Sequence, residues 1–139
     1  MTFEEKRTWV YLVTSVGAYL VYLVIMLQRT AHTPVANVPY VATLLWTTVA
    51  STVASMVGGV AVETARRSET RRPDVRDREI ARFADHTSRW FVVAGATAAF
   101  CMALAKWDYF WIANVIYLGF VLWAAVGSVL RLVAYRRGM

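Results

Sequence analysis

Asp74, Asp77 and Glu79 are spaced closely enough to be considered for metal chemistry. A Mg²⁺–diphosphate site needs several carboxylates that converge with room for the waters of the metal. The chain has one such cluster with no second acidic motif, and four arginines between residues 71 and 78 neutralise it. We therefore predict a solvated, ion-paired helix at this position, with no catalytic residue and no metal site.

The other reactive side chains, His32, His86 and Cys101, are isolated in the sequence. The predicted spans separate the two histidines by a membrane, and the single cysteine has no CxxC or Cys/His spacing around it. No carboxylate falls inside a predicted span, although a proton-coupled exporter needs one there. The sequence therefore favours a non-enzymatic role, and no cofactor is predicted.

Aromatic and amide side chains in the apolar segments are the candidates for ligand binding. Tyr11, Tyr19 and Tyr22 are eight and three residues apart, so they share one face of a helix. Aromatic walls with one or two amides suit an apolar or cationic ligand, whereas the alternative role is packing between helices. The full candidate set is Tyr11, Tyr19, Tyr22, Trp46, Asn114 and Trp123.

A basic run between the second and third apolar segments is the candidate for binding a partner or an anionic lipid. Residues 63–89 hold eight of the thirteen arginines, among them Arg71, Arg72, Arg76 and Arg78. Basic residues near an anionic leaflet contribute about 1 kcal/mol each. Binding of nucleic acid is not predicted, because no stretch has the pattern of a nucleic-acid-binding fold and basic loops are usual in membrane proteins.

The apolar segments themselves predict an all-α membrane protein. The chain is 58% hydrophobic and only 17% charged, and the uncharged run Thr8–Leu27 would rise about 30 Å as a helix, enough to cross the hydrocarbon core. We predict a single membrane domain over residues 1–139, a four-transmembrane-helix bundle with spans at about 8–28, 39–62, 89–106 and 109–131. Residues 63–89 are predicted as a loop and helix outside the membrane.

The third helix is predicted to begin near Asp74 and to stand in water for about three turns before it enters the bilayer near Trp90. Opposite charges occupy neighbouring helical positions there, for example Asp85 and Arg89, which predicts pairs along the helix. Arg131, at the end of the fourth span, is expected to extend to the lipid head groups.

The distribution of basic residues predicts the orientation. With four spans, both termini and the basic run share one side, which holds thirteen Lys and Arg residues against two on the other side. Cytoplasmic loops are enriched in Lys and Arg. We therefore predict a membrane protein with both termini in the cytoplasm.

The second and fourth segments resemble each other. Residues 36–46 align without gaps on residues 113–123, with six identities in eleven positions. The alignment pairs Asn37 with Asn114, Tyr40 with Tyr117, and Trp46 with Trp123. It predicts two similar hairpins of the same orientation, related about an axis along the membrane normal. Chance similarity between two apolar helices is the alternative.

The segments DVRDREIARFADHTSRW, FWIANVIYLGFVL and the closing YRRG together resemble a group of uncharacterised small bacterial four-span membrane proteins. The shared features are an Asp-x-Arg-Asp-type segment before the third span and an arginine pair at the end of the chain. The resemblance implies the four-span fold and a bacterial inner membrane, and it brings no activity and no site residues.

Two functional hypotheses follow from the sequence. The first is a non-enzymatic sensor or accessory protein whose cytoplasmic helix contacts lipid or a protein partner. The second is a small-molecule carrier or ligand-binding membrane bundle. A homo-oligomer is also predicted, because rows of small residues allow close helix approach in lipid. We expect Gly58, Gly59, Gly95 and Ala99 at helix–helix contacts.

Overall fold

A computed structural model describes residues 3–34, 37–65 and 75–137 of the chain. Within these ranges the protein is all-α, with helices α1 (Phe3–Thr30), α2 (Tyr40–Ala65), α3 (Val75–Leu104) and α4 (Tyr109–Arg137). Each helix is long and apolar enough to cross a membrane. The predicted fold class, an all-α bundle with four helices able to span a membrane, is confirmed.

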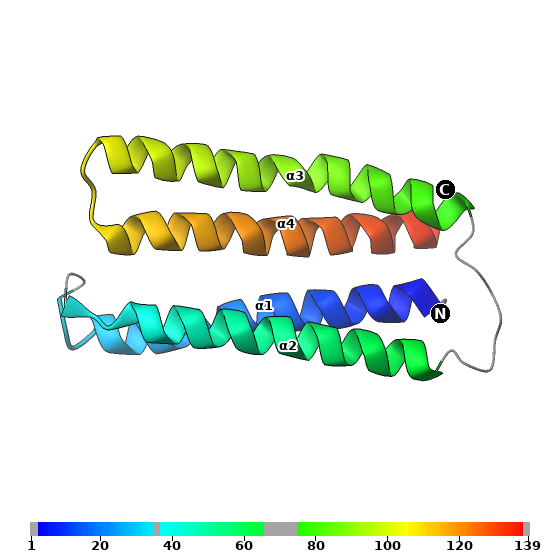
Figure 1. Cartoon of the computed structure of the whole chain (residues 1–139), viewed down its shortest axis with the longest axis horizontal. Coiled ribbons are helices and arrows are strands. Elements are labelled where there is room, and N and C mark those ends of the chain that lie inside the picture. The colour runs from blue at the N-terminus through cyan, green and yellow to red at the C-terminus, as the bar shows by residue number, and fades with distance from the viewer. Residues whose placement is uncertain (1–2, 35–36, 66–74, 138–139) are drawn as a thin grey trace.

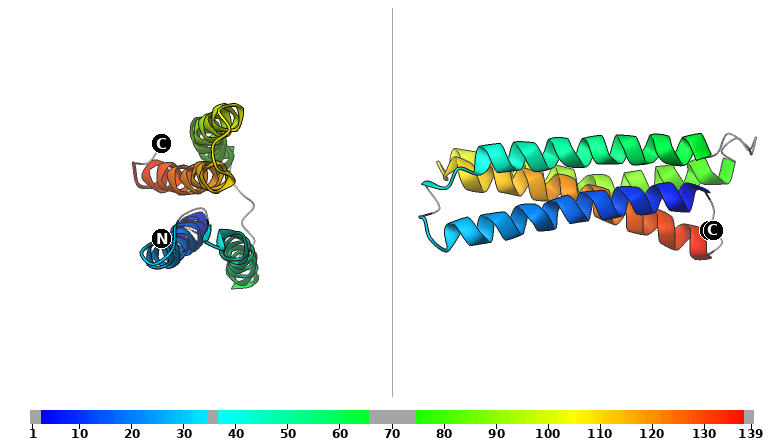
Figure 2. Two further views of the ribbon diagram at one scale, coloured as in Figure 1. Left: turned by 90° about the vertical axis from the view of Figure 1, so that its left-hand side faces the viewer. Right: turned by 90° about the horizontal axis from the view of Figure 1, so that it is seen from below.

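The four helices form two antiparallel hairpins that lie side by side (Figure 1). α1 packs against α2, α4 packs against α3, and α1 also packs against α4, whereas the described parts of α2 and α3 make no comparable contact. The end-on view in Figure 2 shows one hairpin above the other, with α1 and α4 facing each other. Both termini lie at one end of the bundle, here called the terminal end, and the two hairpin turns lie at the turn end.

The α3–α4 hairpin is held by a close approach of two helix backbones. A Cβ atom added to Gly119 would lie 3.2 Å from the carbonyl oxygen of Phe91 and 3.4 Å from Cα of Gly95. A Cβ atom added to Gly95 would in turn lie 3.1 Å from Cα of Gly119. Backbone atoms cannot move aside as a flexible side chain can. This crossing therefore needs glycine on both helices, as in other small-residue contacts between membrane helices.

The α1–α2 hairpin uses a different contact. A Cβ atom at Gly58 would overlap the side chain of Val10 on α1, and the hydroxyls of Thr14 and Ser55 are 2.9 Å apart and hydrogen-bonded. Both interactions join α1 to α2 without a large apolar core, which suits packing in lipid.

The four small residues expected at helix contacts do not all make one. Gly58 and Gly95 do so within the chain, and Ala99 is buried on α3. Nothing lies within 4 Å of a Cβ atom built on Gly59, so this position offers no contact inside the protomer. The predicted homo-oligomer remains a prediction, with Gly59 as the one member of the set open to a neighbouring molecule.

The aligned segments of the predicted repeat lie at different depths in the bundle. Tyr40 is the first residue of α2, whereas Tyr117 lies eight residues inside α4, which starts at Tyr109. Eight residues correspond to about 12 Å along a helix. Asn37 lies before α2, and Asn114 lies within α4. A two-fold axis along the membrane normal would exchange α1 with α3 and α2 with α4, so the α1–α4 contact would require an equal α2–α3 contact. The described parts of α2 and α3 make no such contact. The internal repeat therefore stays a prediction at the level of sequence.

Candidate functional site

An aromatic cluster joins the two hairpins in the half of the bundle nearer the turn end. Tyr22 of α1 is fully buried, at 0% exposure, and its ring lies 5.3 Å from that of Tyr117 of α4 in an edge-to-face arrangement. The ring of Tyr19 lies 5.6 Å from the same tyrosine. Edge-to-face pairs of this kind add about 0.5–1.5 kcal/mol to the free energy gained by burial. The cluster thus stabilises the α1–α4 interface.

Asn114 supplies the polar centre of this cluster. The Tyr22 hydroxyl donates a hydrogen bond of 2.8 Å to Oδ1 of Asn114, and Nδ2 of Asn114 donates one of 2.7 Å to the carbonyl oxygen of Phe110. Both ends of the amide therefore have partners inside the protein. An amide in this state serves as a hydrogen-bonded link between helices.

The six predicted ligand-binding residues consequently separate into three groups. Tyr19, Tyr22 and Asn114 fill the α1–α4 interface. Trp46 is 71% exposed on α2, where lipid is its expected neighbour. Tyr11 and Trp123 are the two that line a cavity.

That cavity, here called the four-helix cavity, has a volume of about 660 Å³ and receives side chains from every helix. It extends from the middle of the bundle towards the terminal end, with α1 and α4 contacting each other and α2 and α3 completing its walls. Its lining residues are Glu4, Arg7, Thr8, Tyr11, Ser15, Ser51, Thr52, Ser55, Met56, Ala81, Asp85, Trp123, Ala124, Gly127, Ser128 and Arg131. Its volume is in the range of small-molecule sites.

Hydroxyl groups dominate the part of the cavity nearer the middle of the bundle. Ser15 and Ser128 donate to the carbonyl oxygens of Tyr11 and Ala124 four residues earlier, at 2.6 and 2.7 Å. The lining residues Ser51 and Thr52 both donate to the carbonyl oxygen of Thr48, three and four residues earlier. These bonds satisfy the hydroxyl donors inside the helices and leave oxygen lone pairs that can accept further hydrogen bonds.

Charged groups occupy the cavity nearer the terminal end. Nη2 of Arg131 on α4 lies 2.5 Å from Oδ1 of Asp85 on α3, and the guanidinium of Arg7 lies 5.9 Å from the centre of the Tyr11 ring. The predicted pairing of Asp85 with Arg89 along α3 is therefore replaced by a bond between helices. Because α3 packs against α4, Asp85 meets Arg131 across the interface. Spacing along α3 alone does not predict this contact.

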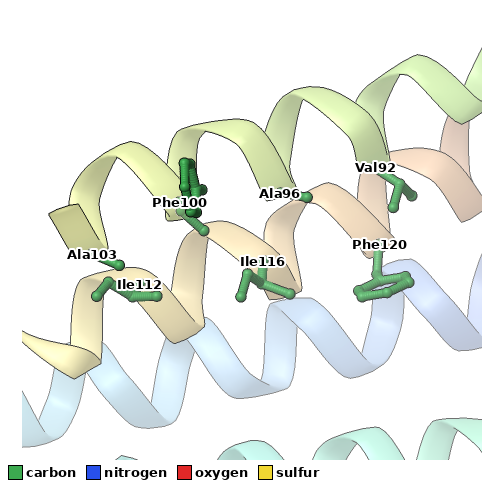
Figure 3. A pocket seen from close by; sticks show the side chains of 8 residues that line it. Val92, Ala96, Phe100, Ala103, Ile112, Ile116 and Phe120 are labelled. Carbon is green, nitrogen blue, oxygen red and sulfur yellow. The ribbon is translucent and has the colours of Figure 1, made fainter.

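A second, apolar depression lies between α3 and α4. This α3–α4 groove has a volume of about 390 Å³ and is lined by Val92, Ala96, Ala99, Phe100, Ala103, Ile112, Ile116 and Phe120. Figure 3 shows the labelled side chains of α3 and α4 on either side of it, all of them hydrocarbon. The groove lies in the half of these helices nearer the turn end.

The basic run is only partly described. Arg71, Arg72 and Asp74 lie outside the described residues, while Arg76 and Arg78 are exposed in the first turn of α3. The hydroxyl of Tyr135, at the end of α4, donates a hydrogen bond to the carboxylate of Asp77. The acidic and basic residues at the start of α3 that the structure describes therefore lie beside the end of α4.

Of the residues that line the four-helix cavity, only Tyr11 and Trp123 are among the six ligand-binding residues predicted from the sequence. A signal was present, because hydroxyl-bearing residues recur on one face of α2 at Ser51 and Ser55. The same spacing also fits a small-residue row for close helix packing, and only the positions of the other helices decide between the two roles. Arg7 and Arg131 are ordinary interfacial residues in the sequence, and the cavity brings them to one site.

No protein-family model, no curated protein and no solved structure matches this chain.

Proposed function

We propose that this chain is a non-enzymatic, multi-pass protein of a bacterial inner membrane that binds an amphiphilic ligand in the four-helix cavity. The observation that carries the proposal is a cavity of about 660 Å³ lined by all four helices. Ligand pockets between helices of a bundle have this size and combine apolar walls with a few polar groups. Tyr11, Met56 and Trp123 supply the apolar walls here.

The change in polarity along the cavity supports an amphiphile. Charged side chains lie at the terminal end, hydroxyls and aromatic rings lie nearer the middle, and the α3–α4 groove beyond is apolar. A ligand with a polar head and an apolar body matches this order, because each part meets groups of its own polarity. α2 and α3, which make no extensive contact, leave a side of the bundle by which the ligand enters from the bilayer.

The orientation belongs to the same proposal. The terminal end faces the cytoplasm because it carries most of the basic residues. α3 has 30 residues, about 45 Å in length, against about 30 Å for the hydrocarbon core. This excess supports a third helix that extends into the cytoplasm, where its arginines meet the anionic leaflet.

Cysteine labelling tests the cavity and the orientation together. We expect Ser51→Cys, in a Cys101→Ala background, to react with a charged, membrane-impermeant maleimide in inverted membrane vesicles and not in intact cells. Ser51 lines the cavity, and a thiol must be hydrated to form the reactive thiolate. The readout is the mass shift of the purified protein.

Val53→Cys is the matched control, because Val53 is 52% exposed on α2 and lies outside the cavity lining. It is two residues from Ser51 and so points to the opposite side of the helix, where lipid excludes the reagent. Equal labelling of both variants, or of neither, contradicts a water-accessible cavity. Labelling of Ser51→Cys in intact cells contradicts the orientation.

A further inference from the structure

The charged groups of the four-helix cavity are balanced in sign. Two carboxylates, Glu4 and Asp85, and two guanidinium groups, Arg7 and Arg131, line its terminal end. A purely anionic head group placed among them would meet both carboxylates, and a purely cationic one would meet both arginines. Like charges at short range oppose binding, whereas a head group carrying one charge of each sign has a partner for both.

These groups retain capacity to bind a ligand. In the Asp85–Arg131 pair the two side chains are 49% and 32% exposed, so the pair is open to the cavity. A guanidinium has five N–H donors, and among the described residues that of Arg131 makes one hydrogen bond, to Asp85. Its Nε has no hydrogen-bond partner there either, but this atom is buried, so a ligand reaches the exposed part of the guanidinium. Both members of the pair can therefore bind further groups of opposite charge.

The α3–α4 groove lies on the same face of α4 as the cavity. Ile116 and Phe120 of the α3–α4 groove are followed by Trp123 and Gly127 of the cavity, a spacing that keeps all four on one face of α4. Phe120 is eleven residues before Arg131, about 16 Å along the helix and about half of the hydrocarbon core. The groove therefore begins at about the mid-plane of the bilayer, where an acyl chain of the cytoplasmic leaflet ends.

We propose that the ligand is a zwitterionic phospholipid of the cytoplasmic leaflet. Its phosphate binds Arg7 and Arg131, its ammonium group binds Asp85 and Glu4, and one acyl chain passes Trp123 and ends at the near edge of the α3–α4 groove, at Phe120. This inference rests on the proposed function and specifies the ligand for the same cavity. Charge-assisted hydrogen bonds to both ends of the head group provide the selectivity.

Native mass spectrometry of the full-length protein in a mild detergent, after removal of co-purified lipid, tests the head group. The probes are phosphatidylethanolamine and phosphatidylglycerol with identical acyl chains. We expect phosphatidylethanolamine to bind about tenfold more tightly, a difference of about 1.4 kcal/mol. Asp85→Asn should remove this preference because it removes the charge that pairs with the ammonium group. Arg7→Gln should weaken binding of both lipids, whereas the control Arg137→Gln, exposed at the same end, should leave it unchanged.

The acyl-chain position is tested by a matched pair on α3. Ala96→Phe fills the α3–α4 groove and should weaken phosphatidylethanolamine binding about tenfold, about 1.4 kcal/mol. Ala98→Phe is the control, since it is two residues away, exposed and outside the groove lining. Wild-type binding by Ala96→Phe overturns the placement of the chain at the edge of the groove.

The outcomes separate the two proposals. Equal or tighter binding of phosphatidylglycerol, or no binding of either lipid while Ser51→Cys is labelled from the cytoplasmic side, overturns the zwitterionic ligand and leaves the cavity in place. Failure of both the labelling and the lipid titration overturns the proposed function itself.

Discussion

Replacing Gly119 with leucine is expected to destabilise the protein by about 3 kcal/mol, the upper end of the range for overpacking. A Cβ atom at this position would meet the carbonyl oxygen of Phe91 at 3.2 Å and the backbone of Gly95 at 3.4 Å. Both contacting groups belong to the backbone and cannot turn away as a side chain can, so α3 and α4 must separate. The measurement is unfolding of the detergent-solubilised protein by circular dichroism.

Gly17→Leu is the control for this substitution, because no atom of another helix lies within 4 Å of its Cβ position. It places the same side chain on a glycine in the middle of α1 at an open site, and we expect unfolding close to that of the wild type. Equal stability of Gly119→Leu and Gly17→Leu would show that the α3–α4 crossing is not a close backbone contact.

Truncation of Tyr22 is the second change with a large expected effect. Tyr22→Ala removes a fully buried ring and leaves a cavity between α1 and α4, which costs about 3–5 kcal/mol in comparable truncations of large aromatic residues. It also leaves Oδ1 of Asn114 without the hydroxyl that donates to it. The free energy of unfolding should fall accordingly in the same circular-dichroism measurement.

Two further variants separate the ring of Tyr22 from its hydroxyl. Tyr22→Phe keeps the ring and should lose only about 0.6–1.7 kcal/mol, the range for hydrogen bonds between membrane helices. Trp46→Ala removes a larger side chain that is 71% exposed and should change stability little. If Tyr22→Phe were as destabilised as Tyr22→Ala, the hydrogen bond rather than the packing would hold the interface.

The helices were predictable because lipid imposes a simple constraint on the sequence. Uncharged runs of about twenty residues mark the spans. The predicted spans 8–28 and 109–131 fall within α1 and α4, whereas the span 39–62 begins just before α2 and the span 89–106 ends just after α3. Helix ends were less predictable, because backbone hydrogen bonding continues outside the apolar region. α1, for example, begins at Phe3, five residues before the uncharged run starts at Thr8.

The site was less predictable, because it depends on the rotation and pairing of helices. Tyr22 and Asn114 were singled out separately, but their contact requires α1 to pack on α4. Trp46 and Trp123 are alike in the sequence, because each is a tryptophan within an apolar segment. In the structure Trp46 is exposed on α2, whereas Trp123 lines the cavity. The bond between Asp85 and Arg131 joins positions 46 residues apart. Spacing along the sequence cannot predict this ion pair, because it forms only when α3 packs against α4.

The α1–α4 interface has a consequence for biogenesis. It is the one extensive contact between the two hairpins among the described helices, and each hairpin already satisfies its backbone hydrogen bonds on its own. Membrane helices can insert first and associate afterwards. Fragments 1–70 and 71–139, expressed as separate polypeptides, should therefore insert independently and reassemble, with Tyr22→Ala preventing their co-purification. Each half of the chain is then an insertion unit, and the aromatic cluster is what makes two units one protein.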